Sequence, residues 1–366
     1  MFTHNGKISV RQVTLLLVLQ MFNMTILILP RIAVDSVGRN GYILPIVAIV
    51  LGIIYIWCIT ALTQKFPGDT LVEIIPKIVP RIIAYTIIIG FALKIIIGIG
   101  LELRMFGEMI NQVMLPKTPL VVMMLVMLLA VVYLVKSGIE ATARMGEILI
   151  YFVFIPLAIV LFKSLLNADY KEVMPFFQTN FKQVGWGSYY ISLSFVPIEF
   201  MLMMGGLMEK PHEARKATFR AVIIIAILES LIILLTICSI GASEVTRQVW
   251  PILTLMQSIQ NAREIMENQE IFMMTGWILS IFMYISSGLY FVSLIGSRSF
   301  KFKRENIFVL PLMPIVYFIA IWPNSLIQTY SYYIKFQQYF GIWFLIPVPI
   351  ILWLIATGRG IKNGNE

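Results

Sequence analysis

Residues 21–31 of the chain read MFNMTILILPR, and this stretch decides how the rest of the sequence is interpreted. An apolar run that begins near Val10 is interrupted here by Asn23 and Thr25, then resumes and stops at Pro30. Inside hydrocarbon, polar side chains and irregular backbone are tolerated only where protein or a water-filled cavity satisfies them. The stretch therefore indicates either a helix broken at a ligand site near the membrane midplane, or a first helix with a few polar packing residues and a proline near its end.

The composition is that of a polytopic membrane protein. Hydrophobic residues make up 59% of the chain, charged residues 13%, and the mean hydropathy is +0.88. Soluble domains carry about a quarter charged residues, so this chain has about half the charge that a globular surface needs. The net charge of +9 does not indicate a nucleic-acid partner, because the basic residues are scattered among short loops.

The sequence contains no motif of an enzyme or a metal site. It has no phosphate-binding glycine loop, no paired-histidine metal helix and no nucleophile elbow. Cys58 and Cys238 lie in apolar segments, and His4 and His212 lie in polar connections. We therefore expect no catalytic residues, no cofactor and no metal ion.

Apolar windows long enough to cross the hydrocarbon, about 20 residues each, follow one another along the whole chain. We expect one all-α integral membrane domain with ten transmembrane helices. The longest connections are near 165–187 and 242–270, and the second contains an amphipathic stretch at 252–259 that forms either a cap over the outer mouth or an interfacial helix. The ten windows cover residues 10–34, 42–64, 82–111, 118–136, 142–166, 188–208, 216–241, 271–296, 306–323 and 339–357.

Basic residues are concentrated in alternate connections, which sets the expected orientation. Lys and Arg favour short cytoplasmic loops, so the distribution predicts cytoplasmic N- and C-termini. The residues that this orientation places inside are Lys65, Lys77, Arg81, Lys136, Arg144, Lys210, Arg215, Lys216, Arg220, Arg298, Lys301, Lys303, Arg304, Arg359 and Lys362.

Ten spans divide into two halves of five, about 10–166 and 188–357. Because five is odd, the second half crosses the membrane in the opposite sense to the first, which is the topology of a 5+5 inverted repeat. Span 6 then corresponds to span 1. Span 6 is interrupted as well, because residues 188–200 read SYYISLSFVPIEF.

Two breaks at corresponding positions of the two halves point to a binding site near the midplane. We expect Asn23 and Thr25 to supply polar contacts at the first break, with Ser192 and Ser194 at the second. The alternative is that Pro197 only kinks span 6, and that the two serines satisfy the carbonyls freed by the kink.

Charged residues within the spans are the remaining candidates. Lys94 lies near the centre of span 3, where a lone ammonium is costly. Glu199 in span 6 and Glu229 in span 7 lie at a matching depth, and the pattern indicates either a structural lysine–carboxylate pair or a proton-linked or substrate-linked switch. Arg104 and Glu108, four residues apart near the outer end of span 3, are expected to form an interfacial ion pair.

The chain resembles the spore germination protein family, the permease-like B subunits of bacterial germinant receptors. That family belongs to the amino acid–polyamine–organocation transporter superfamily. The resemblance covers essentially the whole chain, and the order of several short motifs carries it. These are Leu29-Pro30-Arg31, Phe66-Pro67-Gly68-Asp69-Thr70-Leu71, Pro116-Lys117-Thr118-Pro119, Gly138-Ile139-Glu140-Ala141-Thr142-Ala143-Arg144, Met208-Glu209-Lys210-Pro211 and Trp250-Pro251.

The resemblance implies a fold of the leucine-transporter type, with broken helices 1 and 6 around a substrate site. It also implies assembly with A and C receptor subunits in the inner membrane of a spore, and detection of an amino acid, a sugar or a nucleoside. Ser286 and Ser287 in span 8 are further site candidates, because span 8 lines the site in this fold. The chain departs from the superfamily at 23–26, which contains no glycine, and in the acidic stretch at 264–270.

Three functions are consistent with these features. The first is a sensor that binds a germinant between spans 1 and 6, with Glu199 contacting an amine or a proton-linked network. The second is an active secondary transporter of amino acids or related solutes, with Lys94 and Glu229 in coupling. The third is a structural subunit that holds the receptor together.

Overall fold

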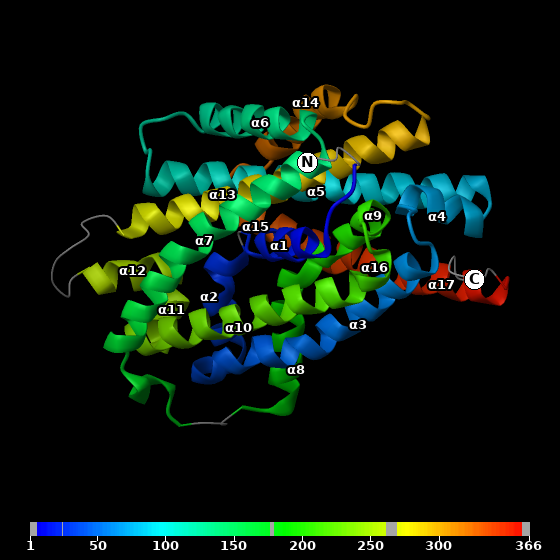
Figure 1. Ribbon diagram of the computed structural model, residues 1–366. Helices are drawn as coiled ribbons and strands as arrows, with labels where there is room; N and C mark the ends of the chain where they lie inside the picture. The colour runs from blue at the N-terminus through cyan, green and yellow to red at the C-terminus, as the bar shows by residue number, and fades with distance from the viewer. Residues whose placement is uncertain (1–5, 24, 176–178, 261–268, 361–366) are drawn as a thin grey trace.

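The computed structural model describes residues 6–23, 25–175, 179–260 and 269–360, without the side chains of residues 25, 258–260 and 269–273. Helices account for the regular structure of the described residues, apart from one isolated β-bridge between Ile8 and Met208 (Figure 1). The α-helices are α1 (Val10–Met21), α2 (Thr25–Val37), α3 (Leu44–Lys65), α4 (Leu71–Ile78), α5 (Arg81–Val113), α6 (Leu120–Lys136), α7 (Ile139–Asn167), α8 (Phe181–Ser192), α9 (Met201–Met204), α10 (Ala214–Ile240), α11 (Ala242–Arg247), α12 (Pro251–Gln260), α13 (Gln269–Ser299), α14 (Val309–Ile321), α15 (Leu326–Phe336), α16 (Ile342–Leu345) and α17 (Pro347–Gly358). The 3₁₀ segments are η1 (Gly38–Ile43), η2 (Tyr170–Val173), η3 (Leu193–Phe200), η4 (Gly205–Leu207) and η5 (Pro211–Glu213), and η6 (Gln337–Gly341) is a π-helical turn.

Seven helical stretches of the described chain are long and apolar enough to cross a membrane, so the protein is a membrane protein. Three shorter apolar helices accompany them, namely α1, α6 and α14. The count of ten spans stays a prediction. The seven long stretches are Ile26–Lys65, Arg81–Val113, Ile139–Asn167, Phe181–Leu207, Pro211–Ile240, Met274–Ser299 and Leu326–Gly358.

The first predicted span is two helices, α1 and α2, which lie in the middle of the bundle in Figure 1. A capping box starts α1, because the Ser9 hydroxyl accepts from the Gln12 amide and the Gln12 side chain accepts from the Ser9 amide. The helix ends at Phe22, whose backbone leaves helical geometry at φ −80°, ψ 55°. Pro30 lies inside α2 and does not end it.

The sixth predicted span is also irregular. It begins as α8, tightens into the 3₁₀ segment η3 and returns to an α-helical turn at α9. All eight residues of η3 are buried, and Pro197 lies within it. A 3₁₀ stretch of this length in the middle of a span is uncommon and often marks a hinge.

The last span differs from the prediction at its start. We expected the span to begin at residue 339, but helical structure begins at Leu326 and is capped by Ser325. Gln328, Lys335 and Gln337 lower the hydropathy of this part, which concealed the helix. The π-helical turn η6 then joins α15 to α16.

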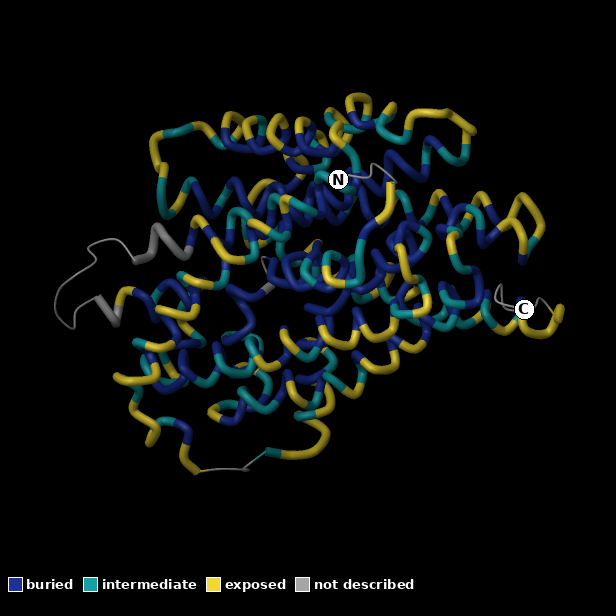
Figure 2. Tube along the Cα trace, viewed as in Figure 1, coloured by how far each residue is buried: buried dark blue, intermediate teal, exposed yellow. Residues whose placement is uncertain are grey.

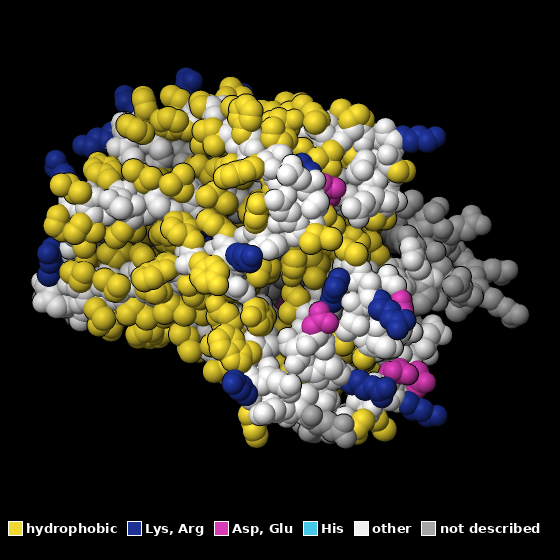
Figure 3. All heavy atoms as spheres, turned by 180° about the vertical axis from the view of Figure 1, so that it is seen from behind, with side chains coloured by type: hydrophobic (Ala, Val, Ile, Leu, Met, Phe, Trp, Pro, Cys, Tyr) yellow, Lys and Arg dark blue, Asp and Glu magenta, His cyan; other side chains and the backbone are white. Residues whose placement is uncertain are grey.

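The outer surface of the bundle is apolar, as a lipid-facing surface must be. On α3 the exposed hydrophobic side chains include Ile46, Val50, Ile53 and Trp57, which recur at helical spacing along one face. Figure 2 shows the buried residues concentrated in the central helices, and Figure 3 shows hydrophobic side chains over most of one face, with Lys and Arg mostly toward its edges.

Candidate functional site

The broken end of α1 is held by α13. The Ser280 hydroxyl contacts two backbone carbonyl oxygens, that of Leu19, at 2.6 Å, and that of Phe22. Carbonyl oxygens at the end of a helix have no following turn to bond them. In the same turn of α1, the Gln20 amide Nε2 donates to the Ser287 Oγ at 2.7 Å. The hydroxyls of α13 therefore satisfy the interrupted helix inside the protein, which is the condition for a break at membrane depth.

Asn23 lies in the break itself, with 1% of its surface exposed. Its carbonyl oxygen accepts a hydrogen bond from the Ile26 amide at 3.2 Å, which starts α2. Thr25, the other residue predicted here, is the first residue of α2, and its side chain lies outside the described part of the structure. The structure therefore brings the Asn23 amide into the buried interior at the predicted break.

The two breaks lie against each other, because α1 packs directly on η3 as well as on α13. At the second break the predicted serines differ. The Ser192 hydroxyl bonds to the Tyr189 carbonyl at 2.7 Å and to the Tyr55 hydroxyl at 2.9 Å, so it is engaged in packing α8 on α3. The Ser194 hydroxyl is buried beside the Glu229 carboxylate. The Ser286 hydroxyl of α13 is buried without a hydrogen-bond partner among the described residues.

Lys94 and Glu199 form a buried ion pair that joins α5 to η3. Only 1% and 2% of their side chains are exposed. Each charge thus compensates the other, which is how two ions are kept inside a low-dielectric interior. Glu229 takes no part in the described ion pairs and lies beside Ser194, with 1% of its surface exposed.

Other polar side chains surround the Lys94–Glu199 pair. A Cβ on Gly341 in η6 would lie 3.3 Å from the Lys94 Cε and would collide with the Gln337 amide, so the glycine makes room for both side chains. A Cβ on Gly98 would lie 3.3 Å from the Tyr284 hydroxyl. The π-helical turn therefore brings Gln337 toward the pair, and π-turns are frequent at functional sites.

The same region continues along α5 to Glu102. The Tyr333 hydroxyl lies beside the Glu102 carboxylate and the Gln337 amide, and the Tyr284 hydroxyl lies beside that of Tyr333. We name this set the central polar cluster: Lys94, Glu102, Glu199, Tyr284, Tyr333 and Gln337. Sequence reasoning missed Tyr284, Tyr333 and Gln337. Tyr333 and Gln337 lie near a predicted span end and resemble interfacial residues, whereas Tyr284 lies in the middle of a predicted span and reads as a packing residue.

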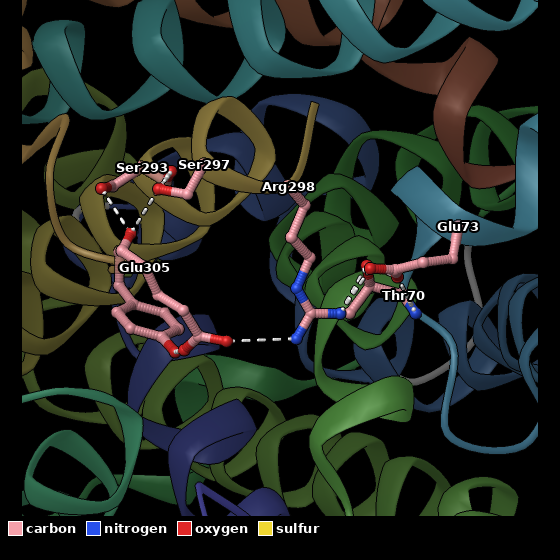
Figure 4. A network of polar contacts seen from close by, with 7 residues as sticks. Thr70, Glu73, Ser293, Ser297, Arg298 and Glu305 are labelled. Carbon is pink, nitrogen blue, oxygen red and sulfur yellow. Dashed lines mark hydrogen bonds and ion pairs between the residues drawn. The ribbon is translucent and has the colours of Figure 1, made fainter. Parts of the chain in front are cut away.

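One end of the bundle is closed by ionic contacts that lie away from the breaks. Arg298 at the end of α13 bonds to the Glu73 carboxylate at 2.8 Å and to the Glu305 carboxylate at 3.3 Å. The Glu305 carbonyl oxygen accepts from the hydroxyls of Ser293 at 2.8 Å and Ser297 at 3.0 Å (Figure 4). Arg298 therefore ties α13 to α4 and to the connection before α14.

The N-terminal segment adds to this closure. The Ile8 amide donates to the Leu207 carbonyl at 2.8 Å, and the Ile8 carbonyl accepts from the Glu209 amide at 3.0 Å. A Cβ on Gly206 would collide with the backbone of Asp69, so the end of span 6 also packs closely on the connection after α3. The segment that follows the second break is therefore fixed from both sides.

The comparisons with known proteins agree with this architecture. The sequence model of the family described as "Spore germination protein" matches residues 7–329. "Spore germination protein YndE" of Bacillus subtilis (strain 168) is 25% identical over 100% of both chains. "Spore germination protein A2" of the same organism is 25% identical over 92% of both.

Among solved structures, the crystal structure of MhsT in complex with L-phenylalanine superimposes with a TM-score of 0.68. The match covers 96% of this chain and 89% of MhsT at 13% sequence identity, so it shows the fold alone. It confirms the predicted all-α, leucine-transporter-type architecture, in which the irregular spans described above are embedded. The chain belongs to the spore germination protein family and has a transporter-like membrane fold.

Proposed function

We propose that this protein is the permease-like membrane subunit of a spore germinant receptor, and that it senses a small nutrient at the two breaks. The observation that carries the proposal is that α1, which ends at Phe22, packs directly against the irregular segment η3 in a buried part of the bundle. Two adjacent broken helices supply backbone and side-chain polar groups that an unbroken bundle does not offer. Partner A and C subunits would receive the resulting conformational change in the spore inner membrane, with both termini cytoplasmic.

The chemistry of the site favours an uncharged or internally neutral polar nutrient. Because Lys94 and Glu199 compensate each other, neither is available as an unpaired charge while the pair is intact. The Ser286 hydroxyl has no hydrogen-bond partner among the described residues and can bond a ligand, as can the Ser194 hydroxyl, which lies beside Glu229. The Asn23 amide is buried at the first break. Amino acids, sugars and nucleosides all carry donors and acceptors that such groups bind, and the L-phenylalanine bound by MhsT is one example from the same fold.

The proposal is tested in spores that carry single hydroxyl deletions, exposed to a panel of amino acids, sugars and nucleosides. Ser194→Ala and Ser286→Ala should each raise the nutrient concentration for half-maximal germination about fivefold to tenfold, the value of one hydrogen bond of about 1–1.5 kcal/mol. Ser164→Ala is the matched control, because the one hydrogen bond that its buried hydroxyl makes among the described residues is to the Val160 carbonyl on α7. Unchanged nutrient response in both site variants, at normal protein levels, would refute the site assignment.

A secondary transporter for amino acids or related solutes is the second candidate, and the buried carboxylate of Glu229 supports it. A carboxylate with no counter-charge among the described residues is a common element of proton coupling within membranes. This function requires concentrative uptake by the chain alone in liposomes, which Glu229→Gln should abolish. Binding of the nutrient without uptake would favour the sensor. A chain that neither binds nor transports would be the structural subunit.

A further inference from the structure

A groove of about 700 Å³ lies between α3 and the start of α10, outside the site described above. Its walls are lined by Ile53, Ile56, Trp57, Gln64, His212, Arg215, Lys216 and Phe219. The groove is divided along its length. One part is apolar and includes Ile53, Trp57 and Phe219, whereas the other is polar and basic and includes Arg215 and Lys216.

The dimensions of the groove follow from the helix that lines it. Ile53 and Gln64 are 11 residues apart on α3, which corresponds to about 16 Å along the helix axis. Trp57 packs edge-on against Trp353 of α17, with ring centroids 5.4 Å apart. Tryptophan side chains are enriched at the boundary between hydrocarbon and headgroups. A groove with Trp57 in its wall therefore fits a place at this boundary.

Arg215 is held in position for an anion. Its Nε donates to the Thr60 hydroxyl of α3 at 3.2 Å. Arg215 takes part in none of the described ion pairs, so its two terminal nitrogens are available to an outside anion. Gln64 fixes the neighbouring turn by donating to the His212 carbonyl at 2.8 Å.

The charges around the mouth of the groove leave a positive excess. The Glu213 carboxylate lies 3.9 Å from the Lys216 Nζ, and 4.0 Å from both the Lys210 Nζ and the His212 Nε2. These neighbours therefore share one carboxylate. Arg215 carries a charge that none of the described carboxylates compensates. An anionic group with an attached alkyl chain would satisfy both parts of the groove.

We propose that this groove binds an anionic phospholipid of the surrounding bilayer. Its phosphate bonds to Arg215 and Lys216, and an acyl chain lies along Ile53, Trp57 and Phe219. Basic pockets between transmembrane helices recognise anionic headgroups in this way. The occupant is a membrane lipid rather than a free phosphate, because Ile53, Trp57 and Phe219 give the groove an apolar wall that a free phosphate would leave uncovered.

The test uses the full-length chain in phosphatidylcholine nanodiscs, with phosphatidylglycerol added stepwise and thermal unfolding as the readout. Phosphatidylglycerol should raise the melting temperature, and Arg215→Gln should weaken its apparent affinity about fivefold, the effect of one basic residue at the membrane surface. Arg220→Gln is the matched control, because Arg220 is exposed on the same helix but does not line the groove. Lys216→Gln repeats the test if Arg215→Gln lowers the melting temperature without added lipid.

Three results would overturn the proposal. Equal stabilisation by phosphatidylglycerol and by further phosphatidylcholine would exclude anion recognition. Equal weakening by Arg215→Gln and Arg220→Gln would show that only the general positive charge of this face attracts anionic lipid. Stabilisation by soluble glycerol phosphate to the same extent as by the lipid would show that the apolar part of the groove has no role.

Discussion

Removal of one member of the Lys94–Glu199 pair is the perturbation whose cost the structure defines best. In Lys94→Met, the Glu199 carboxylate loses its partner while 98% of its surface remains inaccessible to solvent. An unpaired carboxylate in this position is expected to take up a proton. Protonating a carboxyl group whose reference pKa is about 4.3 costs about 3.7 kcal/mol at pH 7. This cost agrees with the roughly 3–5 kcal/mol that is typical of breaking a buried ion pair.

The reciprocal variant Glu199→Gln leaves the Lys94 ammonium alone, and its neutral form requires loss of a proton. At pH 7 this costs about 4.6 kcal/mol for an amine whose reference pKa is about 10.4. The two variants therefore respond to pH in opposite directions. Lys94→Met should become more stable as the pH falls from 7, and Glu199→Gln more stable as it rises, each by about 1.4 kcal/mol per pH unit.

The assay is equilibrium unfolding of the purified chain in mixed micelles across this pH range, with the double variant Lys94→Met/Glu199→Gln completing the cycle. The double variant contains no orphaned charge, so it should be more stable than either single variant, with a coupling of at least about 2 kcal/mol. Additive losses, or single variants with parallel pH responses, would refute the reasoning.

Further predictions concern the contacts that hold the breaks and close one end of the bundle. Ser280→Ala should cost about 1–3 kcal/mol of stability, because carbonyl oxygens at the end of α1 lose a buried donor; unchanged unfolding would show that these carbonyls have another partner. Gly206→Ala should cost about 1–3 kcal/mol, because the added Cβ collides with the backbone of Asp69; a melting temperature equal to wild type would contradict the close packing. Arg298→Gln should increase hydrogen exchange in α4, because the link to Glu73 is lost; equal exchange would show that the ion pair does not restrain that helix.

Much of the fold was predictable because its strongest signals are local. The hydropathy windows located the long helices, and the polar residues at 23–25 and at 192–199 marked both interruptions. The amphipathic stretch at 252–259 lies within a helix, α12, as expected. The Arg104–Glu108 ion pair is confirmed at 2.7 Å. These features depend only on residues that are close together in the sequence.

Features that depend on distant contacts were harder to predict. Lys94 had two carboxylates at a matching depth, and only the three-dimensional packing places Glu199 rather than Glu229 against it. Ser280 was missed, although it lies seven residues before Ser287 on the same face of α13, which is a spacing that could have identified it. The start of α15 was concealed because polar residues such as Gln328 and Lys335 lower the hydropathy of its sequence.

The central claim is that a nutrient binds at the two breaks, and thermal stability of the purified chain tests it most directly. A ligand at a hundred times its Kd should add about 2.7 kcal/mol of stability. The panel contains amino acids, sugars and nucleosides, and the variants are Asn23→Leu in the break and Asn167→Leu on the surface at the end of α7. We predict that one ligand class stabilises the wild type and Asn167→Leu but not Asn23→Leu. Equal stabilisation of Asn23→Leu, or no stabilisation of any chain by any class, would contradict the account.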